Sequence, residues 1–209
     1  MTKSRSMPIS GLYAITPDIT DTHKLLADSE AALAGGARIL QYRNKRASAE
    51  QASEQAAALM TLCRRYAVPL IINDDVQLAI QLDADGVHLG IDDGDIAAAR
   101  AQLGSHKIIG ASCYNNLALA QQAAKLGADY IAFGACFPSS TKPDAPRAEA
   151  ALFTAARELK LPVVAIGGIN LENAHKIIHA GADAIAVIGA LWNAPDIATQ
   201  ARHFNQLFS

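Results

Sequence analysis

The sequence has little cysteine, no excess of charge and no long apolar run, and each absence narrows the possible classes of protein. Its three cysteines, Cys63, Cys113 and Cys136, are an odd number without CxxC or paired-histidine spacing, which argues against a disulfide framework and a structural zinc site. We expect them to be small buried hydrophobic residues. The 18 basic and 20 acidic residues give a formal charge of -2, so the positive field that non-specific nucleic-acid binding requires is missing.

Segments that would direct the chain to a membrane are also missing. No apolar run approaches the roughly 20 residues needed to span a bilayer, and the first residues, MTKSRSMPIS, lack the apolar core of a signal peptide. We therefore expect a cytoplasmic protein that acts on small molecules and has no nucleic-acid or membrane partner. The sequence leaves open whether the chain forms a homo-oligomer.

What is present is enough apolar sequence for one well-buried core. The chain has 209 residues, of which 51% are hydrophobic, and no low-complexity linker or compositional break interrupts it. We expect a single catalytic domain over residues 1–209, with residues 1–10 as a flexible N-terminal extension.

Short apolar runs rich in β-branched residues alternate with longer stretches of helical period that are rich in alanine and leucine. We predict strands that begin at Gly11 (GLYAIT), Ile39 (ILQYR), Pro69 (PLIIND), Gly86 (GVHLG), Lys107 (KIIGASC), Tyr130 (YIAFGAC), Pro162 (PVVAIGG) and Ala184 (AIAVIG). Each predicted strand is followed by a predicted helix.

The connections from helix to strand repeat a short pattern. Glycines close predicted helices at Gly35 and Gly36, at Gly127 and at Gly181. The last two begin the tripeptide GAD before an apolar strand, and DADGVHL at Asp83 echoes it. Such repeated units in about 200 residues fit an α/β protein with a single (β/α)8 TIM barrel better than an open doubly wound sheet, which remains the alternative.

The second predicted strand ends in the polar run QYRNK, residues 41–45. In a TIM barrel the C-terminal ends of the strands carry the active site. The two-residue period of a strand points Gln41, Arg43 and Lys45 to one side, towards the barrel axis and mouth. Buried cations need partners, so either nearby acidic residues or an anionic ligand neutralises them. A purely structural cluster of ion pairs is the alternative.

Acidic pairs follow the third and fourth predicted strands, Asp74-Asp75 and Asp92-Asp93. Carboxylates that converge at neighbouring strand ends repel each other unless a cation lies between them, and oxygen ligands suit Mg2+. The alternative is that one aspartate of each pair is a helix N-cap, because both pairs immediately precede predicted helices. Both can hold, with one aspartate capping and the other binding metal.

Candidate phosphate-binding segments follow the sixth, seventh and eighth predicted strands. The hydroxyl-rich run from Phe137 to Lys142 could hold phosphate oxygens, and a plain solvated loop is an equal alternative. Small residues at Gly167-Gly168 and Gly189-Ala190 let backbone N–H groups approach an anion, as such loops commonly do in barrels. The sequence thus predicts a metal-assisted anion site near strands two to four and a backbone anion site at strands seven and eight.

Eight motifs cover nearly the whole chain from Gly11 onward: QYRNK, INDDVQLA, ADGVHLGIDD, GASCYN, ADYIAFG, FPSSTK, VVAIGGIN and GADAIAVIGA. In this order they resemble the motif series of the thiamine-phosphate synthase family. The resemblance implies a transferase of thiamine biosynthesis that uses Mg2+. In the implied reaction a 4-amino-2-methylpyrimidine methyl diphosphate loses pyrophosphate, and the nitrogen of a thiazole phosphate attacks the resulting carbocation-like centre.

The resemblance also implies roles for individual residues. The pyrimidine diphosphate would be bound by Gln41, Tyr42, Arg43, Asn44, Lys45, Asn73, Ser112 and Lys142, among which Arg43, Lys45, Ser112 and Lys142 are the implied catalytic residues. The thiazole phosphate would be held by Ser139, Ser140, Thr141, Gly168, Ile188 and Gly189, and Mg2+ by Asp74 and Asp93. These assignments agree with the chemistry, because release of pyrophosphate needs cations that stabilise charge on the leaving group.

The implied reaction needs no general base, because the aminopyrimidine supplies its own electron push and positioning does much of the work. We therefore expect His88 to be an oriented interior side chain. Three positions depart from the commonest family pattern: Ser139 in the hydroxyl loop, Ile91 where Gln is common, and Gly189 where Ser is frequent. Ile91 leaves the surroundings of Asp93 open.

Three competing functions remain. A thiazole tautomerase shares the scaffold, but retention of Asn73, Asp74 and Asp93 argues against it. A non-catalytic module that binds thiamine precursors would not need the Mg2+ carboxylates. A phosphosugar lyase or isomerase would need a Schiff-base lysine or an acid/base carboxylate pair at the strand ends, and no lysine lies in the middle of a predicted strand.

Overall fold

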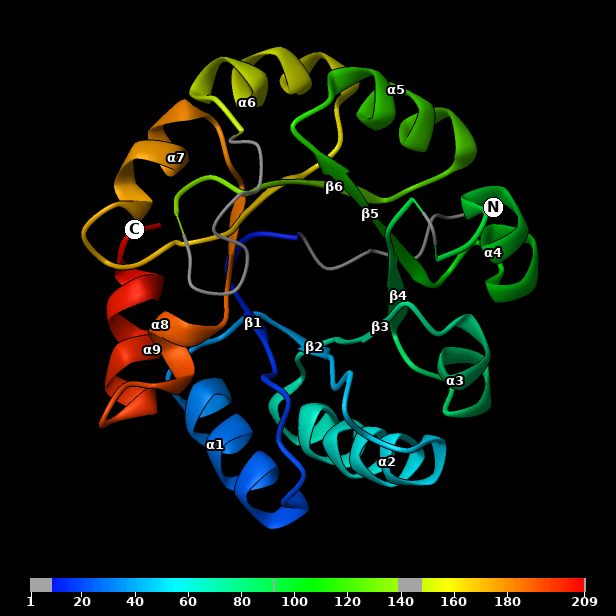
Figure 1. The fold of residues 1–209 in the computed structure, drawn as a ribbon, viewed down its shortest axis with the longest axis vertical. Helices are drawn as coiled ribbons and strands as arrows, with labels where there is room; N and C mark the ends of the chain where they lie inside the picture. Colours follow the sequence, from blue (N-terminus) through cyan, green and yellow to red (C-terminus); the bar gives the residue numbers. More distant parts are fainter. Residues whose placement is uncertain (1–8, 92, 139–147, 209) are drawn as a thin grey trace.

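A closed barrel of parallel strands surrounded by helices forms the protein in the computed structural model, which describes residues 9–91, 93–138 and 148–208 (Figure 1). The strands follow one another around the barrel in sequence order, and β1 closes it by pairing with β8. Their bounds are β1 Gly11–Ile15, β2 Ile39–Tyr42, β3 Leu70–Asn73, β4 Gly86–Leu89, β5 Ile108–Tyr114, β6 Tyr130–Phe133, β7 Val163–Ile166 and β8 Ala184–Val187. The predicted TIM barrel is therefore confirmed.

Alternation along the strands separates an inner core from an outer core. The inner core fills the barrel and contains Tyr13, Ile71 and Tyr130 together with small residues of β8. The outer core lies between the strands and the helices and holds most of the other buried apolar side chains. All three cysteines are free and buried, as expected.

Polar caps begin most of the helices that surround the barrel. The helices in the described part of the chain are α1 Thr22–Ala34, α2 Ala49–Tyr66, α3 Val76–Gln81, α4 Ile96–Leu103, α5 Leu117–Leu126, α6 Ala150–Ala156, the 3-10 helix η1 Arg157–Leu159, α7 Ala174–Ala180, α8 Gly189–Trp192 and α9 Ile197–Gln206. Side-chain oxygens accept from first-turn N–H groups at Asp21, Ser48, Asp75, Asp95, Asn116 and Asp196. Gly127 and Gly181 end α5 and α7 in the left-handed conformation.

An aspartate repeated before every second strand explains the pattern that ends in GAD. Oδ2 of Asp85, before β4, accepts from Leu70 N of β3 at 2.8 Å. In the same way, Asp129 before β6 accepts from Ile109 N of β5, and Asp183 before β8 accepts from Val163 N of β7, each at 2.8 Å. Each carboxylate satisfies a backbone donor at the N-terminal end of the barrel, away from the mouth.

The N-terminal stretch predicted as an extension is only partly described. Residues 1–8 lie outside the described residues, and Ile9 is buried in the inner core. None of the helices in the described part of the chain combines the length and apolar character that crossing a bilayer would require.

Candidate active site

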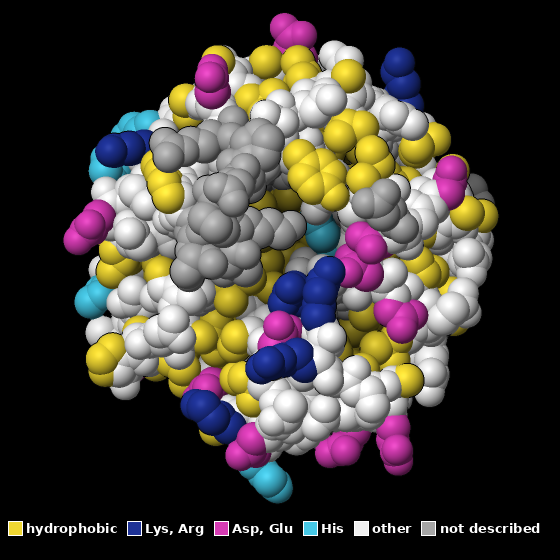
Figure 2. Space-filling view, in the orientation of Figure 1, with side chains coloured by type: hydrophobic (Ala, Val, Ile, Leu, Met, Phe, Trp, Pro, Cys, Tyr) yellow, Lys and Arg dark blue, Asp and Glu magenta, His cyan; other side chains and the backbone are white. Residues whose placement is uncertain are grey.

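The C-terminal ends of the strands surround a central hollow, and charged side chains gather at one side of it. Figure 2 shows Lys and Arg beside Asp and Glu over β2 and β3, at the rim of this hollow. The strand ends that the sequence analysis singled out therefore lie at one mouth, as the barrel topology requires.

The three uncharged residues of the QYRNK run divide between different surroundings. Gln41 is buried inside the barrel, where its Nε2 donates to the Tyr13 hydroxyl at 2.8 Å. Tyr42 points into the outer core instead and donates to Gln55 Oε1 at 2.9 Å. Asn44 Nδ2 donates to the Ile19 carbonyl at 2.8 Å and to the same Gln55 oxygen, so it ties the β2 loop to α2. Side chains of Tyr42 and Asn44 are thus not brought to the mouth.

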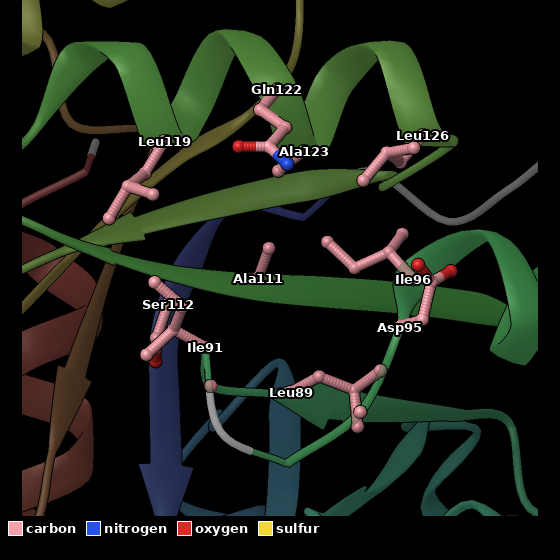
Figure 3. Close-up of a pocket in the computed structure, with 12 residues that line it drawn as sticks. Leu89, Ile91, Asp95, Ile96, Ala111, Ser112, Leu119, Gln122, Ala123 and Leu126 are labelled. Atoms are coloured by element: carbon pink, nitrogen blue, oxygen red, sulfur yellow. The ribbon is translucent and has the colours of Figure 1, made fainter.

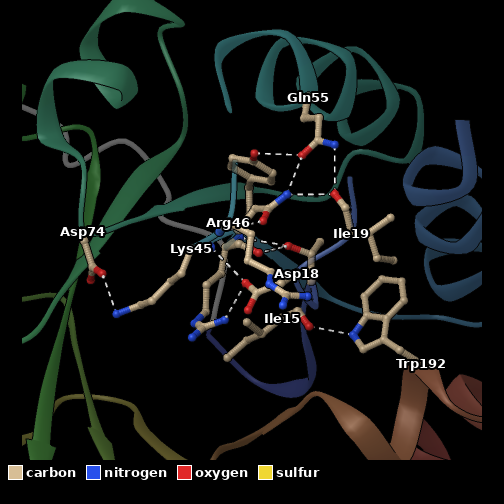
Figure 4. A network of polar contacts seen from close by, with 12 residues as sticks. Ile15, Asp18, Ile19, Lys45, Arg46, Gln55, Asp74 and Trp192 are labelled. Carbon is tan, nitrogen blue, oxygen red and sulfur yellow. Dashed lines mark hydrogen bonds and ion pairs between the residues drawn. The ribbon is translucent and has the colours of Figure 1, made fainter. Parts of the chain in front are cut away.

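The two cations of this run, Arg43 and Lys45, each have an acidic partner (Figure 4). Arg43 Nη1 lies 3.0 Å from Asp18 Oδ1, which also accepts from Lys45 N at 2.8 Å. Lys45 Nζ reaches across to Asp74 Oδ2 at 3.6 Å, with most of its side chain still exposed. Both cations keep donors available for an anion. Asp18 was missed from the sequence, because it lies in the loop after β1 with no motif around it.

Asp74 and Asp93 come from the loops after β3 and β4 and interact with each other. Burial raises the pKa of Asp74 first, and repulsion from the Asp93 carboxylate raises it further, while Lys45 and Asn73 partly offset both effects. Asp74 has a φ of 64°, a left-handed conformation that aspartate tolerates, and its N–H donates to the His88 carbonyl at 2.9 Å. The backbone therefore holds this carboxylate in a position where a negative charge is unfavourable.

The neighbouring aspartates have structural roles, in part as predicted. Asp75 caps α3 by accepting from Leu78 N at 2.8 Å, which confirms capping for the first acidic pair. For the second pair, Asp92-Asp93, the capping alternative was wrong, because Asp95 caps α4 instead. Asp93 Oδ2 accepts from Gly90 N at 2.9 Å, across the turn that follows β4. Asp92 lies outside the described residues.

Two convergent carboxylates are a donor set that suits a hard divalent cation. A cation with oxygen ligands would remove the repulsion that raises the pKa of Asp74, and Mg2+ usually takes one or two carboxylates and completes its shell with water and phosphate oxygens. Within the described residues there is no group of three or more His, Cys, Asp or Glu side chains that could hold a metal. The carboxylates of Asp74 and Asp93 match the number that Mg2+ usually takes from a protein.

A chain of polar groups runs through the barrel below this mouth. From Gln41 it continues through the hydroxyls of Tyr13 and Tyr130, which lie 2.7 Å apart, to His88 Nδ1 at 2.9 Å. His88 Nε2 lies 2.9 Å from Ser112 Oγ of β5. Burial lowers the pKa of His88 to about 4, so the imidazole is neutral at physiological pH.

Ser112 is also one of the residues that line a cavity of about 320 Å³ between α4 and α5 (Figure 3). Leu89, Ile91 and Ile96 form one wall of this cavity, and Leu119 and Gln122 of α5 face them. Ser112 thus contacts the polar interior through His88 and lines the cavity beside α4 and α5.

The predicted thiazole-phosphate residues lie on the other side of the mouth and are described only in part. Gly168, after β7, has a φ of 64°, and a Cβ there would lie 2.4 Å from the Pro138 carbonyl oxygen, so only glycine lets the β6 loop cross at this point. Ile188 and Gly189 follow β8, where α8 begins. Ser139, Ser140, Thr141 and Lys142 lie outside the described residues.

Relatives of known name agree on one family. A family model described as thiamine monophosphate synthase matches residues 12–191. The sequence is 75% identical over 209 residues, all of both chains, to a protein named thiamine-phosphate synthase in Methylobacillus flagellatus. A protein of the same name in Thiobacillus denitrificans is 53% identical over 206 residues, which cover 98% of this chain and 97% of that one.

A solved structure extends the agreement to three dimensions. Thiamine phosphate pyrophosphorylase from Pyrococcus furiosus has a TM-score of 0.84 and 35% sequence identity to this chain, with 95% of each chain covered. The chain therefore belongs to the thiamine-phosphate synthase family of transferase enzymes.

Proposed function

We propose that this enzyme joins an aminopyrimidine methyl diphosphate to a thiazole phosphate, with Mg2+, to give thiamine phosphate and pyrophosphate. The single observation that carries the proposal is the arrangement at the β2 to β4 strand ends. There Lys45 pairs with Asp74, which interacts with Asp93, and Arg43 is held by Asp18 from the loop after β1, so the cations could bind a diphosphate and the carboxylates a divalent cation.

The residues at this mouth would act mainly on the leaving group. The C–O bond to the diphosphate breaks with both electrons on oxygen, so negative charge grows on pyrophosphate as it departs. Arg43, Lys45 and Lys142 would donate to its oxygens, and Asp74 and Asp93 would hold Mg2+, which supplies further positive charge there when bound. Arg43 is already oriented by Asp18, which reduces the loss of side-chain freedom on binding.

The second half of the reaction requires position rather than proton transfer. The lone pair of the thiazole nitrogen forms the new C–N bond, and no proton needs to leave in that step. Ser139, Ser140 and Thr141, with backbone groups at Gly168, Ile188 and Gly189, would hold the thiazole phosphate so that this nitrogen faces the reacting carbon. Asn73, Ser112 and the interior amide Gln41 would orient the pyrimidine.

Pyrophosphate release tests the proposal directly. Purified protein is mixed with both substrates, with each alone, and with both in excess chelator. We expect release that requires both substrates and Mg2+, with thiamine phosphate formed in equal amount. Tight binding of either substrate without turnover would instead support a tautomerase-like enzyme or a precursor-binding module.

A further inference from the structure

Three buried residues in the barrel, Tyr13, Tyr130 and His88, have polar groups that the proposed reaction does not use. They link Gln41 on β2 to Ser112 on β5 through contacts of 2.8, 2.7, 2.9 and 2.9 Å. Tyr13 and Tyr130 are 1% and 0% exposed, and the Tyr130 ring stacks on the His88 ring with centroids 5.5 Å apart. A hydrogen-bond chain this deeply buried holds its members in one arrangement.

The direction of every hydrogen bond in this chain follows from counting protons. The Gln41 amide Nε2 can only donate, so the Tyr13 oxygen accepts from it. Among the described residues, the hydroxyl proton of Tyr13 then has the Tyr130 oxygen as its one remaining partner. The Tyr130 hydroxyl, which has a single proton, in turn donates it to His88 Nδ1.

The histidine passes this direction on to the serine. Because Nδ1 accepts, a neutral His88 carries its proton on Nε2, and Nε2–H donates to Ser112 Oγ. The Ser112 oxygen is therefore an acceptor towards the barrel interior. In the described part of the chain its own proton has no further partner, and Ser112 is one of the residues that line the cavity between α4 and α5.

We propose that Gln41, acting through Tyr13 and Tyr130, fixes His88 as the Nε2-protonated tautomer, so that Ser112 presents its hydroxyl to a ligand only as a hydrogen-bond donor. Tyr13, Tyr130 and His88 are then positioning residues, since they act through Ser112. The opposite direction would require Ser112 to donate to His88, which would leave only a lone pair for the ligand.

The chemistry of the ligand group follows from this direction. Ser112 recognises a lone-pair acceptor, either an unprotonated ring nitrogen or a phosphate oxygen, and selects against an amino group at the same place. This assignment of the ligand rests on the proposed function, because the aminopyrimidine diphosphate carries all three kinds of group. The tautomer of His88 does not rest on it, since the hydrogen bonds that fix it lie within the protein.

The tautomer is measured on the free, full-length protein by long-range proton–nitrogen NMR of the imidazole rings. The His88 signals are assigned by their loss in His88→Asn. We expect the wild type to show a single neutral ring with its proton on Nε2. In Tyr130→Phe and in Tyr13→Phe the direction is no longer imposed, so a population with the proton on Nδ1 should appear.

Tyr66→Phe is the matched control, because it removes a tyrosine hydroxyl that binds Glu30 on the outer helices at 3.2 Å. It should leave the His88 tautomer unchanged. An Nδ1-protonated ring in the wild type would overturn the proposal, as would a tautomer that neither Tyr13→Phe nor Tyr130→Phe alters. A loss of thermal stability in these variants would not by itself produce the change in tautomer.

The ligand group is tested by binding, which requires no turnover. Inorganic pyrophosphate with Mg2+ and the aminopyrimidine methyl alcohol, which has no phosphate, are titrated into the wild type and Ser112→Ala. A loss of about five- to tenfold is expected for one of the two, as for one hydrogen bond to a neutral or charged acceptor. Weaker binding of the alcohol identifies a ring nitrogen, and weaker binding of pyrophosphate identifies a phosphate oxygen. Unchanged binding of both would refute the donor role of Ser112, whatever the tautomer of His88.

Discussion

Gly110 leaves the space that the Tyr130 ring occupies: a Cβ at Gly110 would lie 2.0 Å from Tyr130 Cζ and 2.3 Å from its hydroxyl oxygen. The two residues are directly paired in register between β5 and β6, and both face the barrel interior. The missing side chain on β5 thus lets the tyrosine of β6 reach His88 on β4. Gly110 belongs to the same GASCYN motif as Ser112. One short strand therefore provides both the room for the Tyr130 ring and Ser112, the last member of the hydrogen-bond chain.

Gly110→Ala should destabilise the fold by about 1–3 kcal/mol, because the Tyr130 ring must leave its place in a filled core. Urea unfolding measures the loss. In a Tyr130→Ala background the same substitution should cost much less, because the clashing ring is gone. An equal cost in both backgrounds would show that the ring is not what excludes a side chain at this position.

Asp74→Asn should stabilise the metal-free protein near neutral pH and abolish Mg2+-dependent turnover. Because the folded-state pKa of Asp74 is raised above its ordinary value of 3.8, the wild type loses stability as pH rises through that folded pKa. Asparagine carries no charge and tolerates the left-handed backbone at this position. In chelator we therefore expect a higher melting temperature for the variant than for the wild type.

The pH dependence separates this cause from a general improvement in packing. The gain of Asp74→Asn should shrink as pH falls through the folded pKa and disappear below the ordinary carboxyl pKa, where the wild-type residue is protonated in both the folded and the unfolded state. Added Mg2+ should raise the melting temperature of the wild type and not that of the variant. A gain that is constant with pH would contradict the role of charge.

Asp75→Ala should lower stability and Asp74→Ala should raise the Mg2+ requirement, although the two residues are adjacent. Asp75 caps α3, so its loss should cost about 1 kcal/mol of stability and leave the Mg2+ concentration for half-maximal activity unchanged. Asp74→Ala should raise the Mg2+ requirement strongly, and Asp93→Ala should do the same. Titration of activity with Mg2+, together with thermal unfolding, distinguishes the two residues. A similar increase in the Mg2+ requirement of Asp75→Ala would show that Asp75 also takes part in metal binding.

Asp18→Ala should weaken binding of the pyrimidine diphosphate, because Arg43 and the backbone N–H of Lys45 lose the carboxylate that holds them both. We expect KM for this substrate to rise by about three- to tenfold, the effect of losing one typical hydrogen bond. Asp28→Ala, which removes an exposed ion pair with Lys24 on α1, should leave KM unchanged. Steady-state kinetics of both variants checks the prediction.

Asp85→Ala should destabilise the barrel without affecting the mouth. It removes the acceptor of Leu70 N at the opposite end of the strands, and an unsatisfied, partly buried N–H costs roughly 1–3 kcal/mol. Asp83→Asn in the same turn keeps a side chain that tolerates the φ of 53° and should change stability much less. Unfolding midpoints compare the two, and an equal loss would contradict a specific role for Asp85.

The barrel itself could be read from local patterns. Strand starts at Gly11, Ile39 and Gly86 were predicted at the residues where they occur, because apolar runs and helix-ending glycines are properties of neighbouring residues. The mouth was also predictable, since parallel strands bring their C-terminal ends to one side. Arg43, Lys45, Asp74 and Asp93 follow strands, and strand order alone placed them together.

Partners across the barrel could not be read in this way. Asp18 pairs with Arg43 across 25 residues, and Tyr13 meets Tyr130 across 117 residues, without any motif that links them. Tyr42 lies one residue beyond Gln41, yet it faces the outer core because successive side chains of a strand point to opposite faces.

Sequence by itself therefore determined the repeated strand-and-helix units, the family and the charged residues Arg43, Lys45, Asp74 and Asp93 after the strands, all of which depend on residues close together along the chain. Only the tertiary structure decided which groups share protons and charge. It buried His88 between Tyr130 and Ser112, and it brought Asp74 against Asp93. The physical reason is that burial and hydrogen-bond direction depend on every strand that closes the barrel, and not on any one segment.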